Sequence, residues 1–103
     1  MSITPDQNHD FPLDTASEWT ANYRKENPNE IKAHAFGRNA IKNILEQEGC
    51  VGIRIYYALN ELGEKQLIVV GVDSNANDLY LGLLAERSFP CPPLCGVKNP
   101  LNS

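Results

Sequence analysis

The clearest candidates for chemistry are the cysteines of Cys91-Pro-Pro-Leu-Cys95-Gly96, in a chain of 103 residues. Three residues separate the two thiols, and the intervening prolines have a fixed φ. This spacing suits two ligands of one zinc ion, with Cys50 or His34 completing the site. The thiols could instead form a local disulfide under oxidation, or pack against a sheet as small hydrophobic side chains. A tetrahedral zinc site usually has a second ligand pair, and the sequence contains none.

The same cysteines give the chain a resemblance to the A-type iron–sulfur carriers. Proteins of that family also run from a helix into a strand, as expected here around Gly49 and residues 52–57, and carry cysteines near the C-terminus. The resemblance implies an iron–sulfur cluster as the alternative cofactor to zinc. The family's C-terminal Cys-Gly-Cys motif is absent from this chain, and Cys50 precedes the strand.

Other polar residues have simpler interpretations. His34 could act as an acid or base, but no nucleophile or carboxylate lies at a telling spacing from it, so a structural role is favoured. Residues 73–78 (DSNAND) begin like a calcium-binding loop. However, Asp78 stands where that loop needs glycine, and Leu84 where it needs glutamate. We therefore predict only an Asx-rich turn.

The segment from Gly49 to Asp73 is predicted to form a β-hairpin around which the rest is organised. Residues 51–59 alternate with the period of a strand, and residues 66–72 are rich in β-branched side chains. The turn Asn60-Glu61-Leu62-Gly63 predicts a register in which Asn60 opposes Glu64. One apolar face then carries Ile53, Ile55, Tyr57, Leu67, Val69 and Gly71. The opposite face is also apolar apart from Arg54 and carries Gly52, Arg54, Tyr56, Ile68, Val70 and Val72.

A helix over residues 38–48, with Gly49 as its left-handed cap, is expected to cover the Ile53/Ile55/Tyr57 face. The other face also needs cover. We predict a homodimer formed through the sheet, by edge pairing or by packing of this face. The expected interface comprises Arg54, Tyr56, Ile68, Val70 and Val72.

An earlier helix carrying Trp19 and Tyr23 is the alternative cover for this second face, and it would leave a monomer. Its aromatic stripe is more typical of core than of a ligand platform. Arg54 needs a partner because it lies on a covered face. A carboxylate such as Glu18 is favoured over an anionic ligand.

The remaining segments complete an α+β fold of two helices, the hairpin and a third strand. Residues 1–12 are predicted to be a mobile tail, and residues 13–103 one domain. The first helix should begin at a capping box of Thr15 and Glu18 and end near Glu26 or Asn27. Residues 31–36 are either extended or helical. Residues 79–89 are expected to form an irregular third strand, and residues 90–103 an extended Pro/Cys tail.

Composition narrows the classes of function. The chain has 9 basic and 13 acidic residues, a net charge of −4 and an isoelectric point near 5.0. A nucleic-acid partner is not expected, because phosphate contacts require a basic patch. No apolar run approaches the roughly 18 residues that span a membrane, and the N-terminal sequence lacks signal-peptide features. We expect a cytoplasmic protein with no membrane partner and with reduced cysteines.

Three segments, WTANYR (19–24), KAHAFGR (32–38) and PCPPLCG (90–96), together with the hairpin, resemble a family of small bacterial proteins of unknown function. The resemblance implies bacterial origin and carries no activity, ligand or catalytic residue. The residues themselves predict a non-enzymatic, self-associating interaction or regulatory module without a cofactor, since no nucleophile–base–orienter set is present. The alternative is a metal-binding or thiol-redox protein that uses Cys91 and Cys95 with Cys50 or His34.

Overall fold

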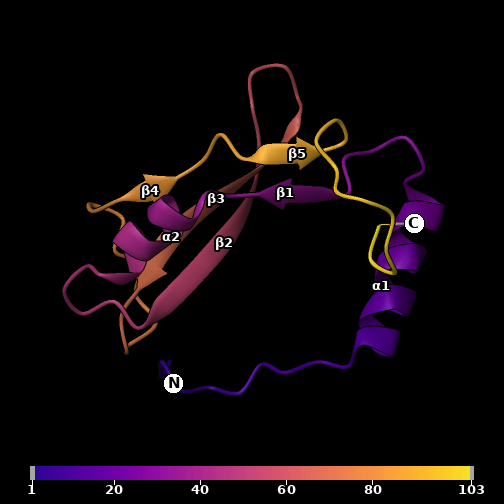
Figure 1. The fold of residues 1–103 in the computed structure, drawn as a ribbon. Coiled ribbons are helices and arrows are strands. Elements are labelled where there is room, and N and C mark those ends of the chain that lie inside the picture. Colours follow the sequence, from indigo (N-terminus) through magenta and orange to yellow (C-terminus); the bar gives the residue numbers. More distant parts are fainter. Residues whose placement is uncertain (1, 103) are drawn as a thin grey trace. The chain divides into compact units, whose positions relative to one another are not determined.

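The computed structural model describes residues 2–102 and contains two helices and two small antiparallel sheets (Figure 1). In chain order the elements are α1 (Leu13–Glu26), β1 (Ala33–Ala35), α2 (Arg38–Leu45), β2 (Gly52–Leu59), β3 (Lys65–Val72), β4 (Leu84–Ala85) and β5 (Phe89–Cys91). One sheet has the order β2-β3-β4, and β1 pairs with β5 in the other. The α+β class, with a hairpin extended by a third strand, is confirmed.

Two compact units make up the described chain. Unit 1 contains residues 2–7 and 36–88, and therefore α2 and the β2-β3-β4 sheet. Unit 2 contains residues 8–35 and 89–102, and therefore α1 and the β1-β5 sheet. The expectation that residues 13–103 behave as one domain stays a prediction, as does the mobility of residues 1–12.

The register of the β2-β3 hairpin is the predicted one. Ile53 opposes Gly71, Ile55 opposes Val69 and Tyr57 opposes Leu67. The turn closes as expected, because the Asn60 N–H donates to the Glu64 carbonyl at 3.1 Å. Gly63 adopts φ +77°, the left-handed conformation that this turn requires.

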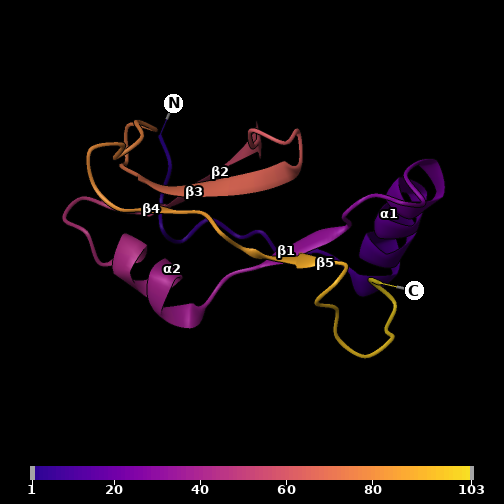
Figure 2. The ribbon, with the colours of Figure 1, turned by 90° about the horizontal axis from the view of Figure 1, so that it is seen from above.

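The core of unit 1 lies between α2 and strands β3 and β4. Ile44 and Val69 are each 1% exposed and pack with Ala85, and α2 lies on one side of the sheet in Figure 2. Gly71 permits this close approach. A Cβ at that position would lie 2.9 Å from the Cys50 sulfur and 3.3 Å from Cγ2 of Ile44.

The predicted cover of the Ile53/Ile55/Tyr57 face is only partly right. The helix ends at Leu45 instead of residue 48, although Gly49 has the expected positive φ of 79°. The shorter helix buries the β3 side of the face, whereas Tyr57 on β2 is 93% exposed. Since β4 comprises only Leu84–Ala85, the predicted third strand over 79–89 is also mostly irregular.

The second face of the hairpin, which carries Val70 and Val72, is covered by other residues of unit 1 at the end of the hairpin away from the turn. Val70 and Val72 are buried, and Val72 forms a bridge with Asp78 in the following loop. Ile3 also lies on this face: its N–H donates to the Ser74 carbonyl at 3.0 Å. Its Cγ2 lies 3.9 Å from the position of a Cβ added at Gly52.

Unit 2 departs further from expectation. Helix α1 begins at Leu13, earlier than predicted, so Thr15 lies inside the first turn and no side chain caps the N-terminus. The predicted capping box is therefore wrong, although the end at Glu26 is correct. No α1 residue is buried; Trp19 is exposed and packs on Phe11 with ring centroids 4.7 Å apart. Residues 31–36 are predicted to be either extended or helical, and residues 33–35 are extended because β1 pairs with β5.

The core assignment predicts the effect of truncating α2. Ile44→Ala should reduce the free energy of unfolding by roughly 2–5 kcal/mol, because it removes a fully buried aliphatic side chain. Leu45→Ala is the matched control, since Leu45 is a neighbour on the same helix but is 45% exposed. Chemical denaturation followed by circular dichroism measures both. A loss under about 0.5 kcal/mol for Ile44→Ala would place this side chain outside the core.

Candidate functional site

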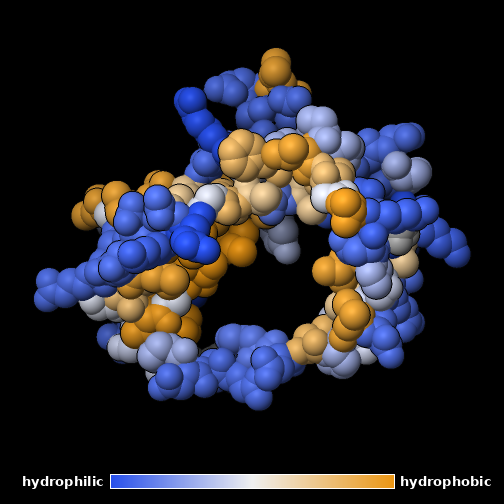
Figure 3. Space-filling view, viewed as in Figure 1, coloured by the Kyte–Doolittle hydropathy of each residue, from blue (hydrophilic) through white to orange (hydrophobic). Residues whose placement is uncertain are grey.

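The strongest candidate for an interaction site is the free edge of β2. Among the described residues 2–102, β2 pairs only with β3, so its other side presents unpaired backbone. The side chains of Ile53, Ile55, Tyr57 and Leu59, here called the edge row, are all exposed. Figure 3 shows apolar atoms gathered along this part of unit 1. An apolar edge strand of eight residues is a template for another strand.

The turn determines which backbone groups of β2 point outward. The Asn60 N–H donates to the Glu64 carbonyl and so points toward the second strand, and this direction alternates from residue to residue along an antiparallel ladder. The even-numbered residues of β2 therefore direct their N–H and C=O groups toward β3. The outward-pointing groups belong to the edge row, so the same residues offer both hydrogen bonds and apolar side chains.

Nothing on this edge resembles the features that normally prevent strand pairing. Proteins protect free edges with lysine, proline or inward-pointing charge. Between Gly52 and Leu59 the only charged residue is Arg54, and its charge is already compensated. At the start of the strand, the Val51 N–H donates to the Val72 carbonyl at 2.9 Å. The Val51 N–H therefore points toward β3 and is not available at the edge. The available edge therefore runs from Ile53 to Leu59.

Arg54 forms an ion pair with Asp78 at 2.5 Å, which confirms an ion pair for this residue but with a different partner from Glu18. Its Nη1 also donates to the Ala76 carbonyl at 3.1 Å, and the Tyr56 hydroxyl donates to the other Asp78 oxygen. The Asp73 carboxylate accepts the N–H groups of Asn75 and Asn77 at 2.9 Å each. The predicted Asx turn thus presents Asp78 to β2.

These contacts shift the ionisation of all three side chains. The hydrogen bond from Tyr56, assisted by Arg54, holds the pKa of Asp78 below its ordinary value. The hydrogen bond to Asp78 raises the pKa of the Tyr56 hydroxyl and that of the Arg54 guanidinium. Asp78 therefore stays ionised and Arg54 charged, and the network fixes the even-numbered face of β2.

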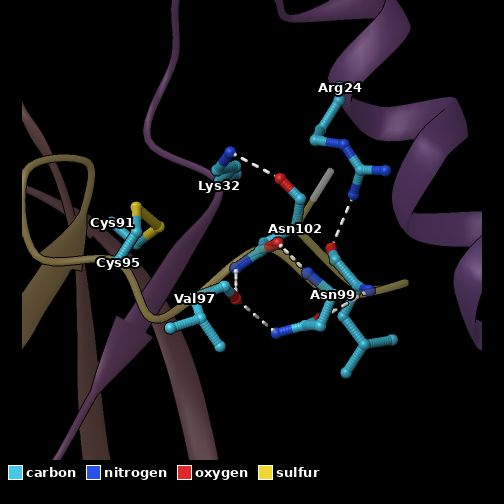
Figure 4. The surroundings of a disulfide bond; sticks show 8 residues. Arg24, Lys32, Cys91, Cys95, Val97, Asn99 and Asn102 are labelled. Carbon is cyan, nitrogen blue, oxygen red and sulfur yellow. Dashed lines mark hydrogen bonds between the residues drawn. A yellow bond between two sulfur atoms is a disulfide. The ribbon is translucent and has the colours of Figure 1, made fainter.

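Cys91 and Cys95 are joined by a disulfide bond with a Cα–Cα distance of 4.8 Å, which differs from the expected reduced state (Figure 4). Cys91 is buried at the end of β5, whereas Cys95 is exposed. Cys50 is the free cysteine, in unit 1. The C-terminal turn beside the disulfide is held by Lys32, whose Nζ donates to the Asn102 carbonyl at 2.8 Å, and by Arg24, which donates to the Leu101 carbonyl.

His34 lies on β1 opposite Pro90, and its partial burial lowers the pKa of the imidazole. Within residues 2–102 no group of three or more histidine, cysteine, aspartate or glutamate side chains is arranged to hold a metal ion. The structure thus joins Cys91 and Cys95 within unit 2, which also contains His34, whereas Cys50 belongs to unit 1. The metal site proposed for these residues stays a prediction.

A shallow, open pocket of about 350 Å³ lies in unit 1, lined by Gln47, Glu48 and residues 78–82. Two of its polar side chains have partners within the chain. Gln47 Oε1 accepts the Leu83 N–H at 2.8 Å, and Asp78 is held by Arg54. We assign no ligand to this pocket.

None of the described helices has the length and apolar character needed to cross a membrane. No family model, no curated protein and no solved structure matches this chain. The resemblances to A-type iron–sulfur carriers and to a family of small bacterial proteins therefore gain no support from these comparisons.

The expected interface of Arg54, Tyr56, Ile68, Val70 and Val72 stays a prediction, although much of it is not free surface. Val70 and Val72 are covered inside unit 1, and Arg54 and Tyr56 are held by Asp78. The sequence predicts instead that a helix over residues 38–48 covers the Ile53/Ile55/Tyr57 face, which contains most of the edge row. The eight-residue length of α2 leaves the β2 half of that face open. No local sequence signal marks this early end, because it depends on the contacts of the Gln47 side chain with the Ile44 carbonyl and the Leu83 N–H.

The Asp78 network predicts an acid-dependent contribution to stability. Since the pKa of Asp78 is lowered in the fold from 3.8, its contribution is present above pH 3.8 and is lost as the pH falls through the lower value. Asp78→Asn should be less stable than the wild type at neutral pH, and the two should converge at acid pH. Thermal unfolding across pH measures the difference, with Asp6→Asn as an exposed control. A difference that is independent of pH would contradict the ionised network.

Proposed function

We propose that this protein is a non-enzymatic interaction module that self-associates through the edge of β2. The observation that carries the proposal is the coincidence of free backbone groups and exposed apolar side chains on the edge row. Large exposed apolar patches on soluble proteins usually mark interaction surfaces. The proposal keeps the expected homodimer and moves its contact from the Val70/Val72 face to the strand edge.

The same proposal includes a cytoplasmic location, on the basis of composition alone. Such a module needs no catalytic group or cofactor. Its two working parts are a stable scaffold, formed by α2 packed on β3 and β4, and the β2 edge. Homo-oligomers are most often two-fold dimers in which one patch meets its own copy.

A charge on the edge tests this proposal. Ile55→Lys should raise the dissociation constant for self-association by at least about tenfold, because a lysine on a strand edge opposes pairing. Since Ile55 is 48% exposed, the monomer should remain folded. Sedimentation equilibrium at several micromolar concentrations measures the constant, and circular dichroism verifies the fold.

Leu62→Lys is the matched control. Leu62 is 82% exposed at the tip of the hairpin, outside β2, so the same change in charge and size should leave self-association unaltered. A wild-type chain that sediments as a single 11.4 kDa species at every concentration would contradict the proposed function.

A thiol-redox function is a second candidate, favoured by the disulfide between buried Cys91 and exposed Cys95. An external thiolate can attack the Cys95 sulfur. The S–S bond then breaks, a mixed disulfide forms and Cys91 leaves as a thiolate. A second external thiolate completes the reduction, and the external pair becomes the disulfide. In a reducing compartment a disulfide of this kind is more often catalytic or redox-sensing than structural.

The metal-binding form of this alternative is tested by elemental analysis after purification under reducing conditions without chelator. We expect neither zinc nor iron at a stoichiometric level, because the described residues do not assemble a ligand set of three or more. A metal content near one equivalent would support the alternative if it vanished in Cys91→Ser/Cys95→Ser, since structural zinc takes about four ligands.

A further inference from the structure

We propose that β2 pairs antiparallel with β2 of a second copy, in a register that places Tyr56 on the two-fold axis. This inference rests on the proposed function and specifies its partner and geometry. Ile55 would oppose the partner's Tyr57, and Ile53 would oppose the partner's Leu59. Two three-stranded sheets would thereby become one continuous sheet.

The direction of the backbone restricts the possible registers. Outward hydrogen-bonding groups belong to the edge row, so a residue of this row must oppose another residue of the row in the partner. With Tyr56 on the axis, every residue of the row is paired with another member. The hydrogen-bonding capacity of the edge is then satisfied along its whole length, from Ile53 to Leu59.

Neighbouring two-fold registers are poorer. With Ile55 on the axis, Leu59 would oppose Val51, whose N–H already donates to the Val72 carbonyl at 2.9 Å. With Tyr57 on the axis, Ile53 would oppose Glu61, which lies in the hairpin turn outside β2. With Arg54 on the axis, two arginines would face each other directly, and like charges in such pairs are destabilising.

The side chains of the proposed register are compatible on both faces. On the edge-row face, Ile55 beside the partner's Tyr57 is a β-branched–aromatic pair, a favourable cross-strand combination. On the other face Arg54 would oppose the partner's Ala58, so the two guanidinium groups are separated. Each Arg54 also keeps its Asp78 counter-ion at 2.5 Å, so the contact region carries no uncompensated charge despite the net charge of −4 of each chain.

This self-complementarity is the reason for choosing a second copy as the occupant of the edge. A strand of another protein would need its own matching apolar row, whereas the antiparallel copy supplies one automatically. Isologous contacts of this kind close on themselves and form a dimer instead of a fibre.

Cysteine crosslinking tests the register. Residues on the axis form a non-hydrogen-bonded pair with Cα atoms about 4.5 Å apart, which is within the range that a disulfide can bridge. Tyr56→Cys chains should therefore crosslink to one another under mild oxidation. Ala58→Cys is the matched control, because position 58 opposes position 54. We expect at least about tenfold more crosslinked dimer for Tyr56→Cys than for Ala58→Cys or the wild type, whose free Cys50 sets the background.

Because Tyr56→Cys removes the Tyr56–Asp78 hydrogen bond, a second pair of variants tests the register with this bond intact. A mixture of Ile55→Cys and Tyr57→Cys chains should crosslink more than either chain alone. The register is overturned if the wild type dimerises by sedimentation while Tyr56→Cys and the mixture both fail to crosslink, or while Ala58→Cys crosslinks fastest; the proposed function would survive that result. A strictly monomeric wild type would overturn both.

Discussion

The turn that joins β2 to β3 is the constraint on which unit 1 depends. The Asn60 side-chain oxygen accepts the N–H groups of Leu62 and Glu64, both at 2.9 Å, and the Gly63 N–H donates to the Asn60 carbonyl at 3.0 Å. These bonds fix a single register, and in a strand a shift by one residue would exchange the two faces completely. The turn therefore decides which side chains meet α2, which meet Asp78, and which backbone groups remain at the free edge.

The two strands of the hairpin have different environments because of what lies beyond them. Strand β3 is central, and Val69, Val70 and Val72 on it are buried. Val69 packs with α2 and β4, and on the opposite face Val72 forms a bridge with Asp78. Strand β2 has a neighbour on one side only, and α2 ends before it can cover Tyr57 and Leu59. An apolar strand of this length remains exposed at a cost in solubility. A partner strand that pairs with the β2 edge would explain why this apolar strand is left exposed.

Much of this arrangement follows from local sequence, and the rest depends on contacts between distant segments. The hairpin register followed from Asn60 and Gly63, and the Asx turn from Asp73, because each requires only neighbouring residues. The end of α2 was missed because the Gln47 side chain turns back to the Ile44 carbonyl and accepts a hydrogen bond from Leu83. Asp78 as the partner of Arg54, separated by 24 residues, and the pairing of β1 with β5 have no periodic signal. The disulfide was one of several open alternatives, since spacing alone does not distinguish a bond from two thiols.

Backbone amide exchange of β2, measured by NMR as a function of protein concentration, tests the central claim most directly. At low concentration the amides of Arg54, Tyr56 and Ala58 should be protected by β3, and those of the edge row should exchange freely. As concentration rises, the amides of Ile53, Ile55, Tyr57 and Leu59 should become protected together, because each then donates to a second copy. Edge-row amides that exchange freely at every concentration, while the chain self-associates, would contradict the assignment of the β2 edge as the contact.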